Sequence, residues 1–180
     1  MSTSAQPSES EFRLLYERTS ARVYRYVRRR CEEADCDDVI AEVFVVAWRR
    51  FDKLPADPLP WLLGVARRAL AHHWRSLQRR QRLALEIQGL EQTAGPDSAT
   101  EVIERLSMLD ALAKLNPDDR EILLLTGWDG LDCQGAAQVL EISAGAARAR
   151  LSRARRRLVA EFDTSPAPDL PALRLATEGN

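Results

Sequence analysis

Apolar residues recur every three or four positions along most of this 180-residue chain, and this spacing restricts the fold more than any other feature of the sequence. Such a period places the apolar side chains on one face of a helix. The clearest series start at Phe12, Ile40, Leu62 and Val102. No segment alternates apolar and polar residues with the period of two that is typical of strands. The sequence therefore predicts an all-α protein.

The helical pattern is lost for a long stretch at residues 88–100 (QGLEQTAGPDSAT), where Gly, Pro, Ser and Thr replace the apolar series. This composition is typical of a flexible linker, so we expect two small helical domains. The predicted segments are a disordered N-terminus at 1–10, a first domain at 11–87, the linker at 88–100, a second domain at 101–162 and a loose proline-rich tail at 163–180.

Side chains that can cap a helix N-terminus indicate where several helices begin. Three prolines in residues 52–60 end one helix, and the next is expected to start near Pro60. Gly127 and Gly130 end another helix. The predicted N-terminal signals are Asp35 with Asp37 and Asp38, Asn116 with Pro117, Asp132, and Ser143.

Composition excludes several classes of protein. The chain is 45% hydrophobic and 29% charged, which is typical of a folded globular protein. Its longest apolar run, residues 43–48, is far shorter than the roughly 20 residues that span a bilayer. The N-terminus lacks the basic start and apolar core of a signal peptide, and three cysteines are too few for a disulfide scaffold. We therefore expect a cytoplasmic protein with reduced thiols.

Charge is distributed in blocks, although the net charge is only -1. Residues 31–42 contain six acids and no base, whereas residues 61–85 and 142–160 each contain six arginines and no acid. Two separate basic blocks favour two phosphate-binding surfaces. A solvated helix face is the alternative for any single block.

The clearest local pattern is a predicted helix-turn-helix near the C-terminus. A short helix at 133–140 and a three-residue break precede a helix whose inward stripe is Ala147, Leu151, Ala154 and Leu158. Small and basic residues on the other face could enter a major groove, although an ordinary amphipathic helix is the alternative. The outward residues are Gly145, Arg148, Ala149, Ser152, Arg153 and Arg156.

The helix after Pro60 has a second basic face. Arginine suits phosphate binding, and Trp61 could stack on an unpaired base, whereas Trp74 is expected in the core. The residues of this face are Arg67, Arg68, Ala71, His72, Arg75, Gln78 and Arg79.

No pattern of the sequence predicts a metal site or a catalytic centre. His72 and His73 point about 100° apart on a helix and cannot chelate one ion together. Cys31 and Cys36 have no second pair nearby, and no phosphate loop or nucleophile motif is present. We therefore expect a protein that is not an enzyme and needs no cofactor or metal.

Five stretches together resemble one family, the extracytoplasmic-function sigma factors of bacterial RNA polymerase. They are VYRYVRRR, DDVIAEVFVVAWRRFDKLP, PWLLGVARRALAHHWR, ALAKLNPDDREILLL and AAQVLEISAGAARARLSRARRRL, and the resemblance covers about four-fifths of the chain. It implies that residues 11–87 are similar to the second sigma domain and residues 101–162 to the fourth, with core polymerase and promoter DNA as partners. An anti-sigma factor would be one means of restraint, and self-masking by residues 31–42 or the tail would be another.

The resemblance also assigns roles by segment. The predicted polymerase-binding residues are Asp37, Asp38, Glu42, Phe44, Trp48 and Arg49. The loop at 52–60 is similar to the one that captures a flipped base of the −10 element, and the predicted −10 residues are Trp61, Arg67, Arg68, His72, Arg75 and Arg79. The predicted −35 residues are the outward residues of the helix-turn-helix.

The sequence departs from the family pattern at several of these positions, so the promoter sequence does not follow from it. Ala41 replaces the usual Gln, and Arg68 and His72 stand in an altered −10 motif. Small residues at 135–137 and 145–147 replace the residues that are usual in the helix-turn-helix of the family. Two other hypotheses are a repressor that binds duplex DNA without polymerase and, more remotely, a metal-dependent hydrolase. The near-neutral net charge counts against the first and the Cys and His spacing against the second.

Overall fold

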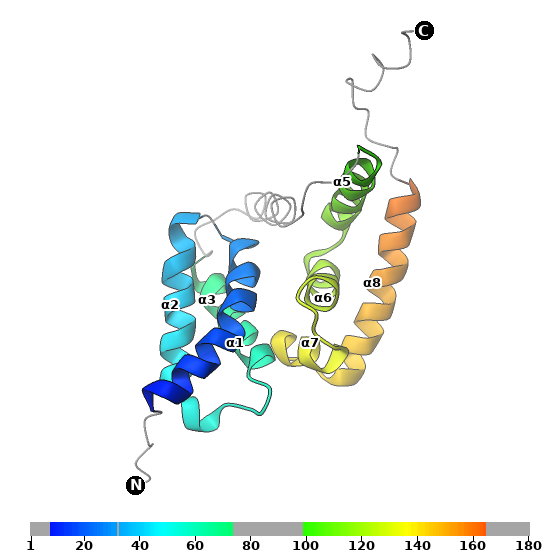
Figure 1. Cartoon of the computed structure of the whole chain (residues 1–180). Coiled ribbons are helices and arrows are strands. Elements are labelled where there is room, and N and C mark those ends of the chain that lie inside the picture. The colour runs from blue at the N-terminus through cyan, green and yellow to red at the C-terminus, as the bar shows by residue number, and fades with distance from the viewer. Residues whose placement is uncertain (1–7, 32, 74–98, 165–180) are drawn as a thin grey trace.

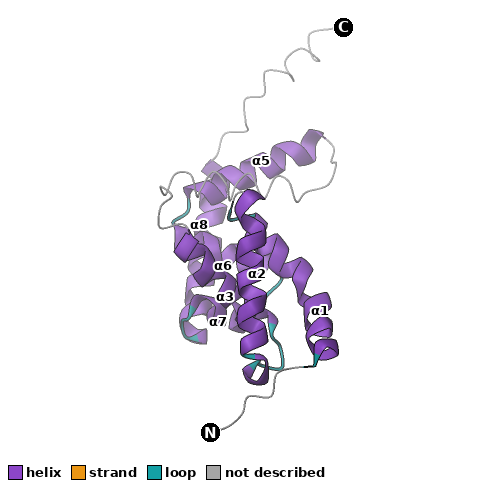
Figure 2. Cartoon of the chain, turned by 90° about the vertical axis from the view of Figure 1, so that its left-hand side faces the viewer, coloured by secondary structure: helices purple, strands orange, loops and turns teal. Residues whose placement is uncertain are grey.

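The computed structural model describes residues 8–31, 33–73 and 99–164 of the chain (Figure 1). All regular structure in these ranges is helical, with no strand, which confirms the all-α prediction (Figure 2). The predicted linker lies outside the described residues apart from 99 and 100, as does the tail apart from 163 and 164. The elements are α1 (Glu9–Arg28), α2 (Glu33–Arg49), the 3-10 turn η1 (Phe51–Lys53), α3 (Leu59–His73), α5 (Ala99–Lys114), α6 (Pro117–Gly127), α7 (Cys133–Leu140) and α8 (Ala144–Thr164).

Capping side chains start the helices close to the predicted positions. Asn116 accepts a hydrogen bond from the backbone N–H of Asp119 at 2.9 Å, and Asp132 accepts one from Gly135 at 2.7 Å. Ser143 does the same for α8, accepting from Ala146 at 3.1 Å. These bonds satisfy N–H groups that have no partner within the helix. The predicted disordered N-terminus at 1–10 extends too far, because Ser8 caps α1 and the helix begins at Glu9.

Helices α1, α2 and α3 pack around one apolar core and form the first domain (Figure 1). Tyr26, Val43, Leu62 and Leu70 are all fully buried there. An aromatic cluster joins the start of α1 to the end of α2. In this cluster the ring of Phe12 meets the edge of Trp48 at 4.9 Å between centroids. These contacts fix the angle between the two helices and leave the opposite side of α2 exposed.

Helices α5 to α8 form the second domain, in which α7 and α8 have the predicted helix-turn-helix arrangement. Ala136, Ala147 and Ala154 are fully buried between its helices, so small side chains allow the close packing. Arg120 of α6 is also buried. It donates hydrogen bonds to the carbonyl oxygens of Leu112 (2.9 Å) and Leu115 (2.8 Å), which ties α6 to the C-terminal end of α5.

The two domains are in direct contact, because α7 packs against α3 (Figures 1 and 2). A side-chain carbon added at Gly64 would lie 3.9 Å from the Cα atom of Val139, and one added at Gly135 would lie 3.2 Å from the ring of Pro60. Gly135 therefore allows α7 to approach α3 closely, whereas a side-chain carbon at Gly64 would make only an ordinary contact. A single buried apolar cluster runs through both domains. The sequence indicates two helical halves but contains no sign that they pack together.

Candidate nucleic-acid interface

The first candidate surface is the outer face of α8, the second helix of the helix-turn-helix. All six residues predicted there are exposed, and Ala147, Leu151 and Ala154 of the predicted inward stripe are buried, with Leu158 half-buried. The flanking Arg150 and Arg157 pair with Asp118 and Asp119 of the same domain. Arg148, Arg153 and Arg156 make no ion pair with another described residue, so their guanidinium groups face solvent and are available to phosphates or base edges.

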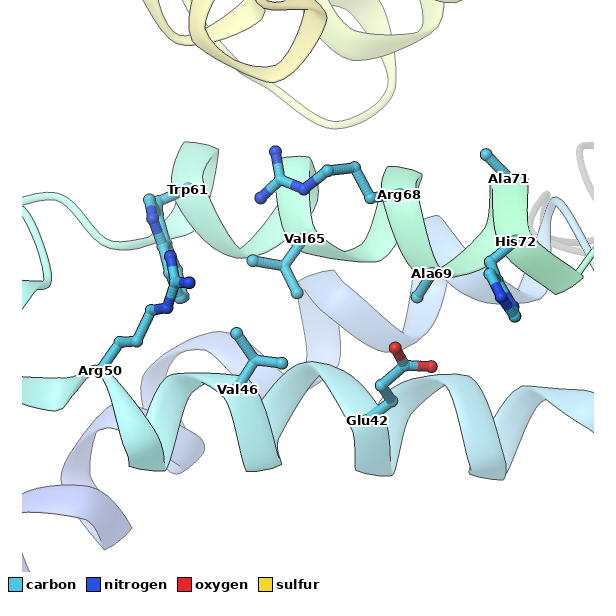
Figure 3. A pocket seen from close by; sticks show the side chains of 9 residues that line it. All are labelled: Glu42, Val46, Arg50, Trp61, Val65, Arg68, Ala69, Ala71 and His72. Carbon is cyan, nitrogen blue, oxygen red and sulfur yellow. The ribbon is translucent and has the colours of Figure 1, made fainter.

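The second candidate surface is a groove of about 540 Å³ between α2 and α3. Figure 3 shows Arg50 and Trp61 at one end of it and His72 toward the other, with Glu42 reaching in from α2. A flat indole, two guanidinium groups and an imidazole can stack on bases and bind phosphates. The groove is lined by Glu42, Val46, Arg50, Trp61, Val65, Arg68, Ala69, Ala71 and His72.

The structure brings some of the predicted −10 residues together but not all of them. Trp61, Arg68 and His72 line the groove, whereas the half-buried Arg67 does not. Arg75, Gln78 and Arg79, like Trp74, lie outside the described residues. The loop before α3 has an exposed middle, and Leu59, the first residue of α3, is buried. The sequence analysis did not identify Arg50. This residue follows α2, and only the folding of the chain brings it to the same groove as Trp61.

The predicted polymerase-binding residues of α2 divide into two groups. Asp37, Asp38, Glu42 and Arg49 are exposed along the helix. Phe44 is only 7% exposed and packs edge-on against Phe12, and Trp48 is half-buried in the same aromatic cluster. The charged residues can therefore touch a partner directly, while the aromatic pair holds the helix against α1.

A cluster of charged side chains lies between the two domains, and we call it the interdomain cluster: Arg29 and Arg30 at the end of α1, Tyr26 of α1, Glu121 of α6, and Asp129. Arg29 pairs with Asp129, and an Arg30 Nη2 atom lies 2.9 Å from Glu121. Tyr26 donates to Glu121 at 3.0 Å, and the Arg30 guanidinium lies over its ring. Burial and the neighbouring Arg30 lower the pKa of Arg29, whereas Asp129 opposes that shift.

One further ion pair crosses the domain boundary at the edge of the groove. Arg68 of α3 pairs with Glu141, the residue that ends α7. The backbone of Glu141 is left-handed, with φ of 57°, a conformation that glycine adopts more readily. Figure 3 shows Arg68 extending away from α2, toward the yellow ribbon of the second domain. Sequence reasoning missed this pair and the interdomain cluster.

Cys31 and Cys36 form a thiol pair in the first domain. Their Sγ atoms lie 2.8 Å apart, both residues are buried, and burial raises the pKa of Cys31. His73 is distant in sequence from both cysteines. Its Nε2 atom lies 3.0 Å from the carboxylate of Asp35. Within the described ranges, no group of three or more His, Cys, Asp or Glu side chains is placed to hold a metal ion. A buried thiol of raised pKa, such as that of Cys31, is an unreactive core residue.

An apolar groove in the second domain is a further feature that the sequence analysis did not single out. It has a volume of about 220 Å³ between α5, α6 and α8, and Leu112, Leu124 and Leu158 contribute to its lining. Trp128 stands at its edge and is 42% exposed. None of the helices described here is long and apolar enough to cross a membrane.

The fold and the two basic surfaces define a two-domain helical DNA-binding protein. Family profiles make the class more specific: residues 15–80 match "Sigma-70 region 2" and residues 105–158 match "Sigma-70, region 4". The chain is 34% identical over 141 residues to RNA polymerase sigma factor NccH of Alcaligenes xylosoxydans, a match covering 74% of this chain and 76% of that protein. It is 32% identical to ECF RNA polymerase sigma factor BldN of Streptomyces coelicolor, covering 86% of this chain and 61% of BldN. A match to a longer Xanthomonas campestris protein, "Probable RNA polymerase sigma factor RfaY", covers only 39% of that relative.

Solved structures agree with this class. The structure of CnrH in complex with the cytosolic domain of CnrY is similar, with a TM-score of 0.61, 28% identity and coverage of 88% of this chain and 92% of CnrH. The sigma factor RpoE of Bartonella quintana, solved with the anti-sigma factor NepR, shares the fold with a TM-score of 0.58 at 21% identity, covering 87% of this chain and 99% of RpoE. The chain therefore belongs to the sigma-70 family, within its extracytoplasmic-function group, and acts in promoter-specific initiation of transcription.

Proposed function

We propose that the two surfaces divide promoter recognition between the domains. The exposed face of α8 reads the −35 element as a duplex, and the groove between α2 and α3 binds the −10 element as single strands. The observation that carries this proposal is the position of Arg148, Arg153 and Arg156, which project from the second helix of a helix-turn-helix without an ion-pair partner among the described residues. That helix is the one that enters the major groove in this motif.

The groove supports the second half of the proposal by its chemistry. An unpaired base presents a flat apolar face that an indole can stack on, and Trp61 supplies one. Arg50, Arg68 and His72 supply positive or hydrogen-bonding groups along the same groove for the phosphates. The loop at 52–60 would hold the flipped base beside this groove.

The exposed charges of α2 are proposed to bind core RNA polymerase. Asp37, Asp38 and Glu42 give this surface a negative potential, which would favour a basic partner surface. Because polymerase supplies the chemistry of RNA synthesis, the chain itself would be a non-catalytic subunit that requires no cofactor. It would act in the cytoplasm, where transcription takes place. Complexes of CnrH and RpoE support an anti-sigma factor as a further partner.

Run-off transcription tests the proposal. Purified core polymerase would be incubated with a genomic promoter library, with and without the purified chain. We expect transcripts from a defined subset of promoters only when the chain is present. Binding of the chain to duplex DNA in the absence of polymerase, with no promoter-specific transcript in its presence, would favour the repressor hypothesis and contradict this one.

A further inference from the structure

Two of the six arginines in α8 differ from the others because they have carboxylate partners. The Nη1 atom of Arg150 lies 3.5 Å from the carboxylate of Asp118, and Arg157 pairs with Asp119. Both acids are in the first turn of α6, so the two ion pairs join the start of α6 to the side of α8. The remaining arginines of α8 form no ion pair with another described residue.

The pair of Arg157 with Asp119 is the stronger of the two. The side chain of Asp119 is only 6% exposed, whereas that of Asp118 is 68% exposed. The Asp119 carboxylate also accepts a hydrogen bond from the side-chain amide of Asn116 at 2.8 Å, which fixes its orientation. Separating a buried carboxylate from its cation costs free energy, because the charge stays away from water. Arg157 is therefore held at α6, although its own side chain is 55% exposed.

The two held arginines lie beside the exposed face of α8. Arg150 and Arg157 are seven residues apart, so they share one side of the helix. Arg157 also follows Arg153 by four residues, a spacing that makes the two side chains neighbours on the helix surface. Arg153 belongs to the face that is proposed to bind the −35 element. A released Arg157 would therefore reach the same DNA backbone as Arg153.

The acids of α6 therefore affect how many phosphates α8 can bind. The part of the DNA affinity that is independent of sequence comes from cations that neutralise phosphates. An arginine that is paired with a carboxylate is not available to a phosphate, and the carboxylate itself repels the DNA backbone. Both acids lie on α6, outside the exposed face of α8, so they change this part of the affinity without contacting a base.

We propose that Asp118 and Asp119 are positioning residues, which keep Arg150 and Arg157 away from the DNA backbone. The proposal rests on the binding of duplex DNA by α8 given above. With two arginines withheld, phosphates of any sequence bind α8 more weakly, and contacts to bases supply a larger share of the total affinity. The basic block of α8 thus binds fewer phosphates than its sequence indicates.

A double-mutant cycle on Asp119 and Arg157 tests the proposal in the full-length protein. Asp119→Asn keeps the shape of the side chain and an oxygen that can accept from Asn116, but it removes the charge that holds Arg157. The cycle is completed by Arg157→Ala and by the two changes together. Asp118→Asn is a second variant, at an exposed position where no buried site is disturbed. Circular dichroism establishes that each variant is folded.

Glu9→Gln is the matched control for the change in net charge. Glu9 pairs with Arg13 at 3.0 Å on the surface of α1, so its neutralisation changes the net charge equally but in the first domain. Arg156→Ala is the reference for the loss of one phosphate contact. Arg156 is next to Arg157 in the chain and forms no ion pair with another described residue.

The measured quantity is the Kd for a short labelled DNA duplex of random sequence, at several salt concentrations. One added phosphate contact changes the slope of log K against log salt by about 0.9, so a ten-fold fall in salt strengthens the binding of Asp119→Asn by an additional factor of about eight. We expect Arg157→Ala alone to leave the slope unchanged, but to remove the gain in the Asp119→Asn protein. Asp118→Asn should steepen the slope by a smaller amount, and Glu9→Gln should leave it unchanged.

Three results would overturn the proposal: slopes for Asp119→Asn and Asp118→Asn that equal the slope of the unmodified protein, a gain that persists when Arg157 is replaced, or an equal gain for Glu9→Gln. A loss for Arg157→Ala as large as that for Arg156→Ala would overturn it as well. Failure of the proposed role of α8 gives a different result, because Arg156→Ala would then leave both the affinity and the slope unchanged.

Discussion

At the scale of single residues, the arginines of α8 have different expected roles because of where they lie on the helix. Arg148 is in its first turns, the end that enters the groove in this motif, and Arg156 lies two turns further along. We expect Arg148→Ala to relax the preference for one base of the −35 element, with a loss of about 1–3 kcal/mol of discrimination. Arg156→Ala should weaken binding to all sequences equally and reduce the salt dependence.

Binding of both variants to a set of −35 duplexes with single-base changes, at several salt concentrations, checks this prediction. Arg156→Ala is the internal control, because it removes the same charge from the same helix. An unchanged ranking of the duplexes for Arg148→Ala would show that Arg148 does not read a base.

Arg120 has a structural role that can be tested at the same scale. Its buried guanidinium binds carbonyl oxygens at the end of α5, and hydrogen bonds to charged groups contribute about 1.5–3 kcal/mol each. We expect Arg120→Met to lower the free energy of unfolding by about 2–4 kcal/mol, measured by urea denaturation. Arg150→Met, which removes a partly exposed ion pair, should cost less than about 1 kcal/mol. Equal losses for the two variants would contradict the capping role.

At the scale of the element, α2 has two different faces, and polymerase binding is proposed for one of them. Its aromatic side packs against α1, and its charged side is free for a partner. We expect replacement of Glu42 and Arg49 together by alanine to abolish co-purification with core polymerase, because a few residues carry most of the energy of an interface. Circular dichroism should show unchanged helix content. Undiminished co-purification would assign polymerase binding to another surface.

Local chemistry explains why most elements could be predicted and the contact between domains could not. Asn116, Asp132 and Ser143 act within three residues of themselves, so their effect is visible in the sequence. The outward face of α8 follows from its apolar period alone. Arg29 and Arg30, by contrast, look like the end of a solvated basic run, since their carboxylate partners are 100 and 91 residues away. No local pattern indicates such a pair, or the groove that brings Arg50 to Trp61.

At the scale of the whole molecule, the shared apolar cluster should couple the unfolding of the two domains. Residues of α1, α2 and α3 and residues of α7 and α8 belong to one buried cluster. We therefore expect a single calorimetric transition for the unmodified protein, and two transitions when Glu121→Gln and Asp129→Asn separate the domains. Two transitions in the unmodified protein would indicate that the domain contact contributes little to cooperativity.

The distance in sequence between Arg29 and Asp129 has a consequence for the newly made protein. A ribosome adds about 5–20 residues per second, so the 100 residues between the two partners take about 5–20 s to synthesise. Helices α2 and α3 are made during that interval, so Arg29 stays hydrated while the rest of the first domain is completed. The contact between the two domains can therefore form only after α6 and the residues that follow it have been made.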